Sequence, residues 1–263
     1  MIINSTQIYS FSAILFCALL IVILERIFPY NKGQKFIREG FFDDFVLYNF
    51  VQSFVLGIVI SLIIEFIDAQ TSMSRFKLVG DWPVILQLIF FIVTHDFYIY
   101  IFHKWQHKNK ILWRIHEAHH SPKEVDWLSG VRSHALEILI NQTIEFAPII
   151  LLGAAPEVAV YKGTVSVVWG MYIHSNIDVH SGWLQFIING PEMHRWHHSL
   201  GIGRNRNFST KLAIWDWLFR TSYLPENEKA QNYGLKTYSP ISYYTQFVHA
   251  FRRFKKKKYF YGL

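Results

Sequence analysis

This chain is poor in the residues on which many soluble redox enzymes depend. Charged residues make up only 17% of its 263 residues, whereas soluble domains carry roughly 25%. The single cysteine, Cys17, excludes an intrachain disulfide and also an iron–sulfur cluster held by four cysteines. No Gly-x-Gly-x-x-Gly segment follows a strand pattern to bind a flavin or a nicotinamide. Any redox reaction of this chain therefore needs electrons from a separate protein.

Hydrophobic residues are abundant instead, at 51% of the chain, with 23 Phe, 14 Tyr and 9 Trp. Three long apolar runs cover Ile8–Phe28, Phe45–Ile67 and Pro83–Phe102. A run of about 18 or more apolar residues marks a membrane-spanning helix, and aromatic residues suit the interfacial belts of a bilayer. No basic segment precedes the first run and no small-residue cleavage site follows it, so we interpret it as an anchor and not as a removed signal.

A fourth apolar stretch, Ala135–His174, is interrupted by Pro148, Gly153 and Pro156, which predicts two helices joined by a tight turn. The sequence leaves open whether both arms cross the membrane. We expect an all-α, polytopic integral membrane protein with about four transmembrane helices, a hairpin that could span half the membrane, and a cytoplasmic helical cap that carries a histidine-rich dimetal site. The predicted single domain comprises residues 1–263, with anchor helices in 1–93, a core in 94–221 and a basic tail in 222–263.

Positive charge is placed unevenly along the chain, whose net charge is +7. Much of it lies in 252–258, which beside membrane helices is expected to contact anionic lipid headgroups and not nucleic acid. Lys and Arg also collect in 32–38 and 104–114, and loops rich in these residues face the cytoplasm. The N-terminus should therefore lie outside and the histidine clusters inside, although Arg75 and Lys77 weaken this bias. The predicted location is a bacterial inner membrane rather than the endoplasmic reticulum.

All thirteen histidines lie after residue 94, and most form clusters. A helix over 95–107 would place Asp96, Tyr100, His103 and His107 on one stripe, because their spacings are four, three and four. His103 and His107 would then be paired metal ligands, with Asp96 and Tyr100 behind them to orient an imidazole. In the same helix, His95, which directly precedes Asp96, would point roughly 80° away from the direction of His103. The alternative is a polar stripe that faces other helices.

Two further clusters read His-x-x-His-His-Ser and begin at His116 and His194. In a helix the first and second histidines share a face, and the third widens it. His174 ends the apolar hairpin on the side of the membrane where the other histidine clusters lie. His180 is a further candidate, but Asn176 or Asp178 could replace it as a ligand. The predicted metal ligands are His103, His107, His116, His119, His120, His174, His180, His194, His197 and His198. This number predicts a dimetal site, but imidazole suits Fe, Zn, Cu and Ni alike.

An ordered set of motifs runs from about Thr94 to Thr221: Asp96-x-x-x-Tyr100-x-x-His103-x-x-x-His107, His116-x-x-His119-His120, Arg132-Ser133-His134-Ala135-Leu136-Glu137, His174-Ser175-Asn176, Gly182-Trp183-Leu184, Pro191-Glu192-Met193-His194-Arg195-Trp196-His197-His198-Ser199, Asn207-Phe208 and Trp215-Asp216-Trp217-Leu218-Phe219. This set resembles the fatty acid hydroxylase superfamily, also called the sterol desaturase family. Lys104 stands where many members have Arg, and Ala135 where they often have Pro.

The resemblance implies a membrane protein with a di-iron centre, two iron ions per chain, that uses O2 and external electrons to hydroxylate or desaturate lipids or to cleave ether lipids. Position by position, it implies all the ligands above except His180, at whose spacing many members have no histidine. Zinc has no redox chemistry with which to oxidise an unactivated methylene. We therefore expect a non-haem di-iron oxidoreductase that acts on a C–H bond of a membrane lipid.

Four polar residues, His134, Glu137, Asn141 and Glu145, follow a three-four-four spacing on an otherwise apolar helix. Such a stripe is expected to face a cavity or the metal site, because contact with lipid would be costly. We assign His134 and Glu137 to positions behind the ligands or along the substrate. The alternative is polarity that serves only helix packing.

Competing functions are a membrane metal-binding or transport protein, a zinc-dependent hydrolase and a haem electron-transfer protein. A transporter keeps its ligands near the bilayer midplane, whereas these clusters lie at helix ends. The expected partners are a lipid substrate, O2 and a separate electron donor, a ferredoxin or b-type cytochrome with its reductase; no nucleic acid is expected. An acidic donor would be steered to the basic residues near the first ligands: Lys104, Lys108, Lys110 and Arg114.

Overall fold

The computed structural model describes residues 4–226 and 228–254, so the lysines at 255–258 of the predicted basic tail lie outside the described residues. Within these ranges the chain is helical and contains no strand, only two isolated bridges, Pro29 with Ile177 and Ser199 with Tyr233. The prediction of an all-α chain is therefore confirmed for the described residues.

The three apolar runs form the three long helices. They are α1 (Ser5–Ile27), α2 (Ser53–Thr71), which continues the π-helix η1 (Asp43–Gln52), and α3 (Val84–Lys108). By length and composition these are the described helices that can each cross a membrane. Helix α1 begins where the side chains of Asn4 and Gln7 cap each other's backbone N–H groups.

The fourth apolar stretch forms the predicted hairpin of α5 (Ala135–Leu151) and α6 (Pro156–His174). Its turn requires Gly153, because the backbone has φ of +67° and a Cβ atom there would lie 2.6 Å from the carbonyl oxygen of Ser74. Pro156 occupies the first turn of α6, where its missing N–H costs no hydrogen bond.

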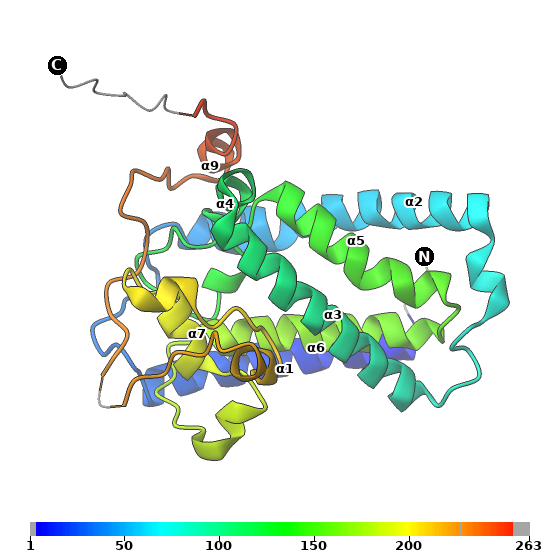
Figure 1. Cartoon of the computed structure of the whole chain (residues 1–263), viewed down its shortest axis with the longest axis horizontal. Helices are drawn as coiled ribbons and strands as arrows, with labels where there is room; N and C mark the ends of the chain where they lie inside the picture. Colours follow the sequence, from blue (N-terminus) through cyan, green and yellow to red (C-terminus); the bar gives the residue numbers. More distant parts are fainter. Residues whose placement is uncertain (1–3, 227, 255–263) are drawn as a thin grey trace.

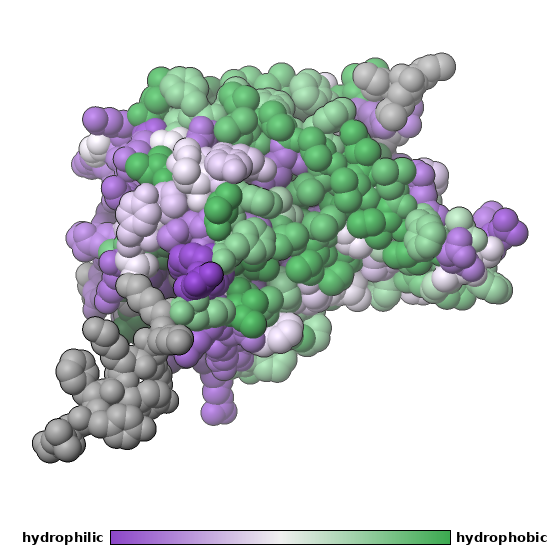
Figure 2. All heavy atoms as spheres, turned by 90° about the horizontal axis from the view of Figure 1, so that it is seen from above, coloured by the Kyte–Doolittle hydropathy of each residue, from purple (hydrophilic) through white to green (hydrophobic). Residues whose placement is uncertain are grey.

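The long helices lie side by side along the bundle, with α1 against α6, α2 against α5, and α3 in contact with both α5 and α6 (Figure 1). Buried apolar side chains such as Leu56, Ile60 and Ala147 join α2 to α5. The outer faces remain apolar as well: Phe11 of α1 is 68% exposed and Phe54 of α2 is 71% exposed. Hydrophobic residues cover the middle of the face in Figure 2, as a bilayer requires.

The short helices gather at the end of the bundle where α3 and α6 end (Figure 1). They are α4 (Lys110–His116), α7 (Pro191–His198) and α9 (Tyr243–His249). Helix α8 (Ile214–Leu218) instead packs beside the middle of α3, where the ring centroids of Trp215 and Phe97 lie 4.9 Å apart. Single turns of 3₁₀-helix join the elements: η2 (Met73–Phe76), η3 (Ser129–Val131), η4 (Gly182–Phe186) and η5 (Ile202–Asn205). This end therefore carries a polar helical layer on an apolar bundle.

A buried network of charges anchors this layer to the loop after α1. Arg38 donates to Asp126 at 2.9 Å and pairs with Asp44 at 2.7 Å, while Arg132 donates to Asp44 at 2.6 Å. All four side chains are at most 3% exposed. The guanidinium group of Arg132 is thus paired with a buried carboxylate. The network fixes the segment between Asp126 and Arg132, which connects the turn after α4 to α5.

Candidate metal centre

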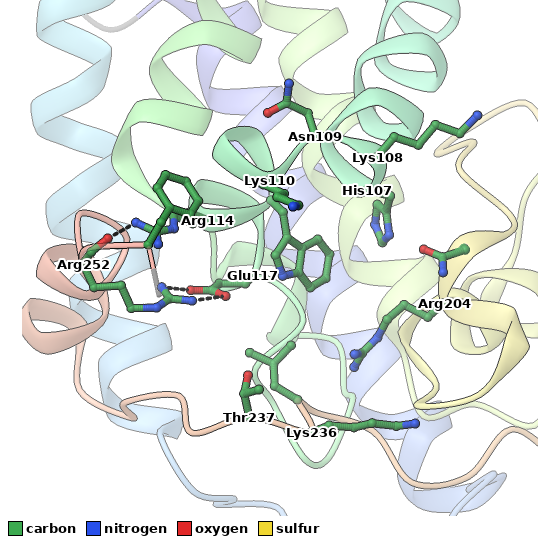
Figure 3. A pocket seen from close by; sticks show the side chains of 14 residues that line it. His107, Lys108, Asn109, Lys110, Arg114, Glu117, Arg204, Lys236, Thr237 and Arg252 are labelled. Atoms are coloured by element: carbon green, nitrogen blue, oxygen red, sulfur yellow. Dashed lines mark hydrogen bonds and ion pairs between the residues drawn. The ribbon is translucent and has the colours of Figure 1, made fainter. Parts of the chain in front are cut away.

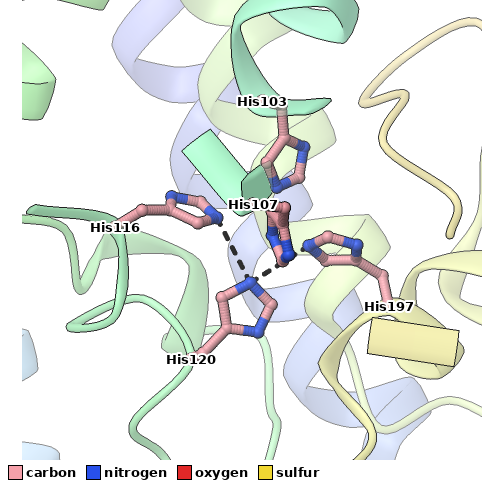
Figure 4. A group of neighbouring side chains, drawn as sticks. All are labelled: His103, His107, His116, His120 and His197. Carbon is pink, nitrogen blue, oxygen red and sulfur yellow. Dashed lines mark hydrogen bonds between the residues drawn. The ribbon is translucent and has the colours of Figure 1, made fainter. Parts of the chain in front are cut away.

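Nine of the predicted ligands converge into two adjacent groups in which the ring nitrogens lie within 4.8 Å of one another. The first group, drawn in Figure 4, contains His103, His107, His116, His120 and His197. The second group contains His119, His174, His194 and His198. These side chains come from the ends of α3, α4 and α6, from the turn after α4 and from α7, so helix ends and this turn form the walls of the centre.

The two His-x-x-His-His segments divide their side chains between the groups in a reciprocal way. His116 and His120 belong to the first group and His119 to the second, whereas His194 and His198 belong to the second and His197 to the first. In α7, helical geometry explains this division, because a residue four positions on is turned by only about 40°, and positions three and four are about 100° apart. In the other segment, His116 is the last residue of α4, and the turn that follows directs His119 and His120 to different groups. The sequence predicted a shared face for the first two histidines; in each segment the first and third share a group.

Hydrogen bonds fix the tautomer of most of these rings. In five of the nine, Nδ1 lies close to an oxygen that can only accept a hydrogen bond: His103 with Phe208 O at 2.7 Å, His116 with Glu137 Oε1 at 2.7 Å, His119 with Arg132 O at 3.2 Å, His174 with Gly170 O at 2.7 Å and His197 with Arg206 O at 2.8 Å. Nδ1 must therefore carry the proton, which leaves the Nε2 lone pair free to bind a metal.

The Nε2 atoms are spaced as ligands of a common ion would be. The separations are His116–His120 3.2 Å, His120–His197 3.1 Å, His119–His174 3.3 Å, His174–His194 3.0 Å and His194–His198 3.1 Å. Two nitrogens at right angles around a metal, each about 2.1 Å from it, lie about 3.0 Å apart. Moreover, Nε2 of His103 and both ring nitrogens of His107 are buried without a hydrogen-bond partner among the described residues. The residues present therefore fit two metal ions.

The electrostatics of the centre keep its rings neutral. Burial, reinforced by neighbouring imidazoles, holds the pKa of His120 and that of His197 well below the ordinary histidine value. A neutral imidazole is the form that ligates a metal. The same neighbours would repel one another if protonated, so the cluster suits cations held between neutral donors.

Glu137 is the one predicted supporting side chain that contacts an imidazole within the described residues. Its Oε1 atom accepts from Nδ1 of His116 at 2.7 Å and from Nε2 of Gln106 at 2.8 Å. The side chain is buried at the start of α5. Glu137 thereby orients His116, and Gln106 in turn orients the carboxylate.

The expectation that Asp96 and Tyr100 orient an imidazole is wrong. The carboxylate of Asp96 accepts three hydrogen bonds from the loop before α8, from Thr210 Oγ1 at 2.7 Å, Lys211 N at 2.8 Å and Leu212 N at 2.9 Å, and one from Trp215 Nε1 of α8 at 3.0 Å. The hydroxyl of Tyr100 pairs with Thr221 at 2.9 Å and accepts from Lys104. Although all share a stripe of α3, Asp96 lies about 10 Å along the helix from His103. Both residues instead hold the loop after α7.

His134 and His180 lie apart from the two groups. His134 caps α5 by accepting from the N–H of Leu136, and its ring stacks on Phe247 with centroids 4.8 Å apart. The side chain of His180 is 85% exposed, and its Nδ1 atom lies 3.5 Å from Glu192. The structure therefore brings neither residue to the candidate metal ligands.

Sequence reasoning missed the acceptors that hold four of the nine rings. They are the backbone carbonyl oxygens of Phe208, Arg132, Gly170 and Arg206. Every residue has a carbonyl, so no residue type marks these positions, and only the folded chain reveals them.

A cavity of about 210 Å³ adjoins both groups of imidazoles. His103 and His116 of the first group and His119, His174 and His194 of the second form part of its wall. The polar stripe of α5 lines it too, through Glu137, Asn141 and Glu145. His134, the fourth residue of the stripe, is not among the residues that line it. The cavity lets a small part of another molecule reach the candidate metal centre.

The sequence model of the fatty acid hydroxylase family matches residues 88–221, just over half of the chain. The chain belongs to the fatty acid hydroxylase family. Both groups of imidazoles lie inside the matched region. The family assignment that the motifs indicated is confirmed.

Relatives within this family are similar to the chain over different lengths. The ornithine lipid hydroxylase OlsE of Rhizobium tropici is 28% identical over 248 residues, which is 91% of this chain and 74% of that protein. Human alkylglycerol monooxygenase is 34% identical over 165 residues, 59% of this chain, and the match spans only 35% of the human protein. A very-long-chain aldehyde decarbonylase of Oryza sativa is 24% identical over 71% of this chain. No solved structure matches significantly.

This family member also has a basic cleft of about 530 Å³ beside His107 (Figure 3). His107 of the first group and Trp113 form part of its wall. Its cationic side chains come from distant parts of the chain: Lys108, Lys110, Arg114, Arg204, Lys236 and Arg252. Glu117 is the acidic side chain that lines it among the described residues, and it accepts from Arg252 at 2.9 Å. The cleft is therefore strongly positive and reaches a candidate ligand.

Proposed function

We propose that this chain is a membrane-bound di-iron oxygenase that hydroxylates a C–H bond of a lipid. The observation that carries the proposal is the gathering of nine imidazoles into two groups beside a cavity, inside a fatty acid hydroxylase domain. The first iron would be held by His103, His107, His116, His120 and His197, and the second by His119, His174, His194 and His198.

Iron is preferred over zinc because the proposed reaction is a redox reaction and the zinc ion does not change its oxidation state. When bound, the irons supply the electron-transfer chemistry needed to use O2 against an unactivated C–H bond. The protein's own part is to orient the rings through the Nδ1 acceptors and to shape the cavity. Glu137 would keep His116 in the ligating tautomer throughout.

The proposed membrane arrangement puts α1, α2 and α3 across the bilayer and embeds the α5–α6 hairpin beside them. The polar layer with α4, α7 and α9 would then be the cytoplasmic cap, in agreement with the Lys and Arg residues of 32–38 and 104–114. A bacterial inner membrane is the proposed location. The whole chain would act as one domain, with the motif-bearing core at its centre.

The proposed substrate is a membrane lipid, because the relatives of known name act on lipids or lipid-derived aldehydes. A lipid chain would enter the cavity from the apolar bundle and bring one C–H bond to the imidazole-lined wall. Hydroxylation by O2 places one oxygen atom in the product and reduces the other to water, which takes two electrons and two protons from outside. These requirements separate the proposed oxygenase from a hydrolase.

The electrons would come from a separate carrier that docks at the basic cleft. A positive cleft attracts an acidic protein such as a ferredoxin or a small b-type cytochrome. Docking there would bring the carrier to His107, a candidate ligand that lines the cleft. The sequence named Lys104 among the docking residues, but its ammonium donates to Tyr100 outside the cleft.

The experiment is reconstitution of the purified protein in lipid with O2, NAD(P)H, a reductase and a ferredoxin. The expected result is O2-dependent formation of a hydroxylated lipid whose new oxygen atom comes from isotopically labelled O2. The His197→Ala substitution should abolish formation of this product. The matched control, His180→Ala, changes a histidine outside both groups and should leave the protein active. Label from water in the product would instead indicate hydrolysis and contradict the proposal.

A further inference from the structure

Three charged or polar side chains meet deep in the bundle, away from the polar cap. Lys162 of α6, Glu145 of α5 and His95 of α3 are 0%, 7% and 8% exposed. The ammonium of Lys162 donates to Glu145, to Ser166 Oγ at 3.2 Å and to Nδ1 of His95 at 3.2 Å. Ionisable groups at such depth are costly in a membrane protein and commonly mark a functional site.

This arrangement determines which ring nitrogen of His95 carries hydrogen. An ammonium group can only donate, so Nδ1 of His95 must be the accepting, unprotonated nitrogen. A neutral ring then carries its hydrogen on Nε2. That Nε2 atom is buried and has no hydrogen-bond partner within residues 4–226 and 228–254. His95 therefore holds a donor without an acceptor.

His95 and Glu145 form part of the wall of the same cavity that adjoins the imidazole groups. His95 precedes His103 by eight residues on α3, which corresponds to about 12 Å along the helix. The residue that holds the unsatisfied donor therefore lines the same cavity as five of the candidate metal ligands. A simple hydrocarbon tail would leave this donor unpaired, since it offers no acceptor.

We propose that the inner end of this cavity binds a neutral oxygen atom of the lipid substrate, a carbonyl, ether or hydroxyl oxygen, through the Nε2–H group of His95. The proposal rests on the proposed lipid oxygenase and names the class of lipid that it takes. His95 is then a positioning residue. By holding the oxygen atom of the lipid, it determines which carbon, at a fixed distance from that oxygen, reaches the metal centre.

The surrounding charges favour a neutral oxygen over an anionic group. Lys162 and Lys211 contribute two positive charges at this end, and Glu145 and Asp96 contribute two negative charges. Lys211 lines the cavity, and Asp96 is held beside it through the backbone N–H of Lys211. A carboxylate or phosphate would add an uncompensated charge to a buried site, which is costly.

The test measures binding and not turnover, so it does not depend on iron or on an electron donor. The probes are a long-chain ketone and the alkane of the same length, and the purified full chain in detergent micelles is titrated with each. The expected preference for the ketone is about tenfold, the effect of one buried hydrogen bond that is otherwise unmade. The His95→Phe variant should lose this preference, because it keeps an aromatic ring but has no donor.

Two further variants separate positioning from a merely structural role. His95→Gln retains an N–H donor and should restore the preference, while Thr94→Val removes an exposed hydroxyl from the same helix and should leave the preference unchanged. Equal binding of ketone and alkane to the wild-type protein would overturn the proposal, whatever the folding of the variants. So would a preference that survives in His95→Phe. Either result would leave the oxygenase proposal standing, whereas failure of the oxygenase assay would not alter this binding ratio.

Discussion

Glu137 is the carboxylate that connects the polar stripe of α5 to the metal centre, and its removal tests how the rings are held. Its Oε1 atom accepts two hydrogen bonds, from His116 at 2.7 Å and from Gln106 at 2.8 Å. In Glu137→Gln the amide oxygen can replace only part of this interaction, because the charge is lost and the amide nitrogen cannot accept. In Glu137→Ala the Nδ1–H group of His116 has no acceptor at all.

The size of the effect follows from the contribution of such partners to metal binding. Loss of the group that orients a histidine ligand weakens metal affinity by about 10- to 100-fold. We assign about tenfold, or about 1.4 kcal/mol, to Glu137→Gln and about 100-fold, or about 2.7 kcal/mol, to Glu137→Ala. Competition with a coloured chelator, under anaerobic conditions in lipid nanodiscs, measures the iron affinity.

The matched control is Asn141→Ala, one turn further along the same face of α5. Asn141 lines the same cavity but bonds to Tyr98 and to no imidazole, so its loss should leave iron affinity unchanged. Unchanged iron affinity in both Glu137 variants would refute the reasoning. Equal losses in the control would show that the effect comes from the helix and not from the hydrogen bond to His116.

Three more outcomes are expected from other parts of the molecule. His119→Ala and His197→Ala should each lower the iron content, as measured by plasma mass spectrometry, because each removes a ligand from a different group; full iron in both would contradict the ligand sets. Lys110→Glu in the basic cleft should slow carrier-dependent turnover and flatten its salt dependence, whereas Lys35→Glu, exposed outside the cleft, should not. Arg132→Met leaves a buried carboxylate in excess and should lower the free energy of unfolding by about 3–5 kcal/mol in mixed micelles; a change below 1 kcal/mol, on the scale of surface pairs, would contradict the buried network.

Much of the helical framework was predictable because long apolar runs leave the chain few alternatives. The hairpin, too, followed from local chemistry, since Pro148, Gly153 and Pro156 mark its turn. The clustering of histidines at helix ends predicted that they converge. Residues spaced by three and four share one face of a helix, whatever packs against that face. The shared faces of the histidines could therefore be predicted from the sequence.

The division of the imidazoles between two groups could not be predicted in the same way. It depends on how α7 approaches the turn after α4, and only the packed chain sets that approach. The role of Asp96 could not be predicted for a related reason. Its position in a stripe on α3 indicates which way the side chain points but not which loop packs against it. Likewise, the pairing of Lys162 with His95 joins helices 67 residues apart, and no local pattern links them.

The number and identity of the metal ions test the central claim most directly. Metal analysis of the wild-type protein, purified anaerobically in lipid and normalised to quantitative amino-acid analysis, should give two irons per chain, one for each group of imidazoles. Zinc in place of iron, or a single metal ion in fully loaded protein, would contradict the account.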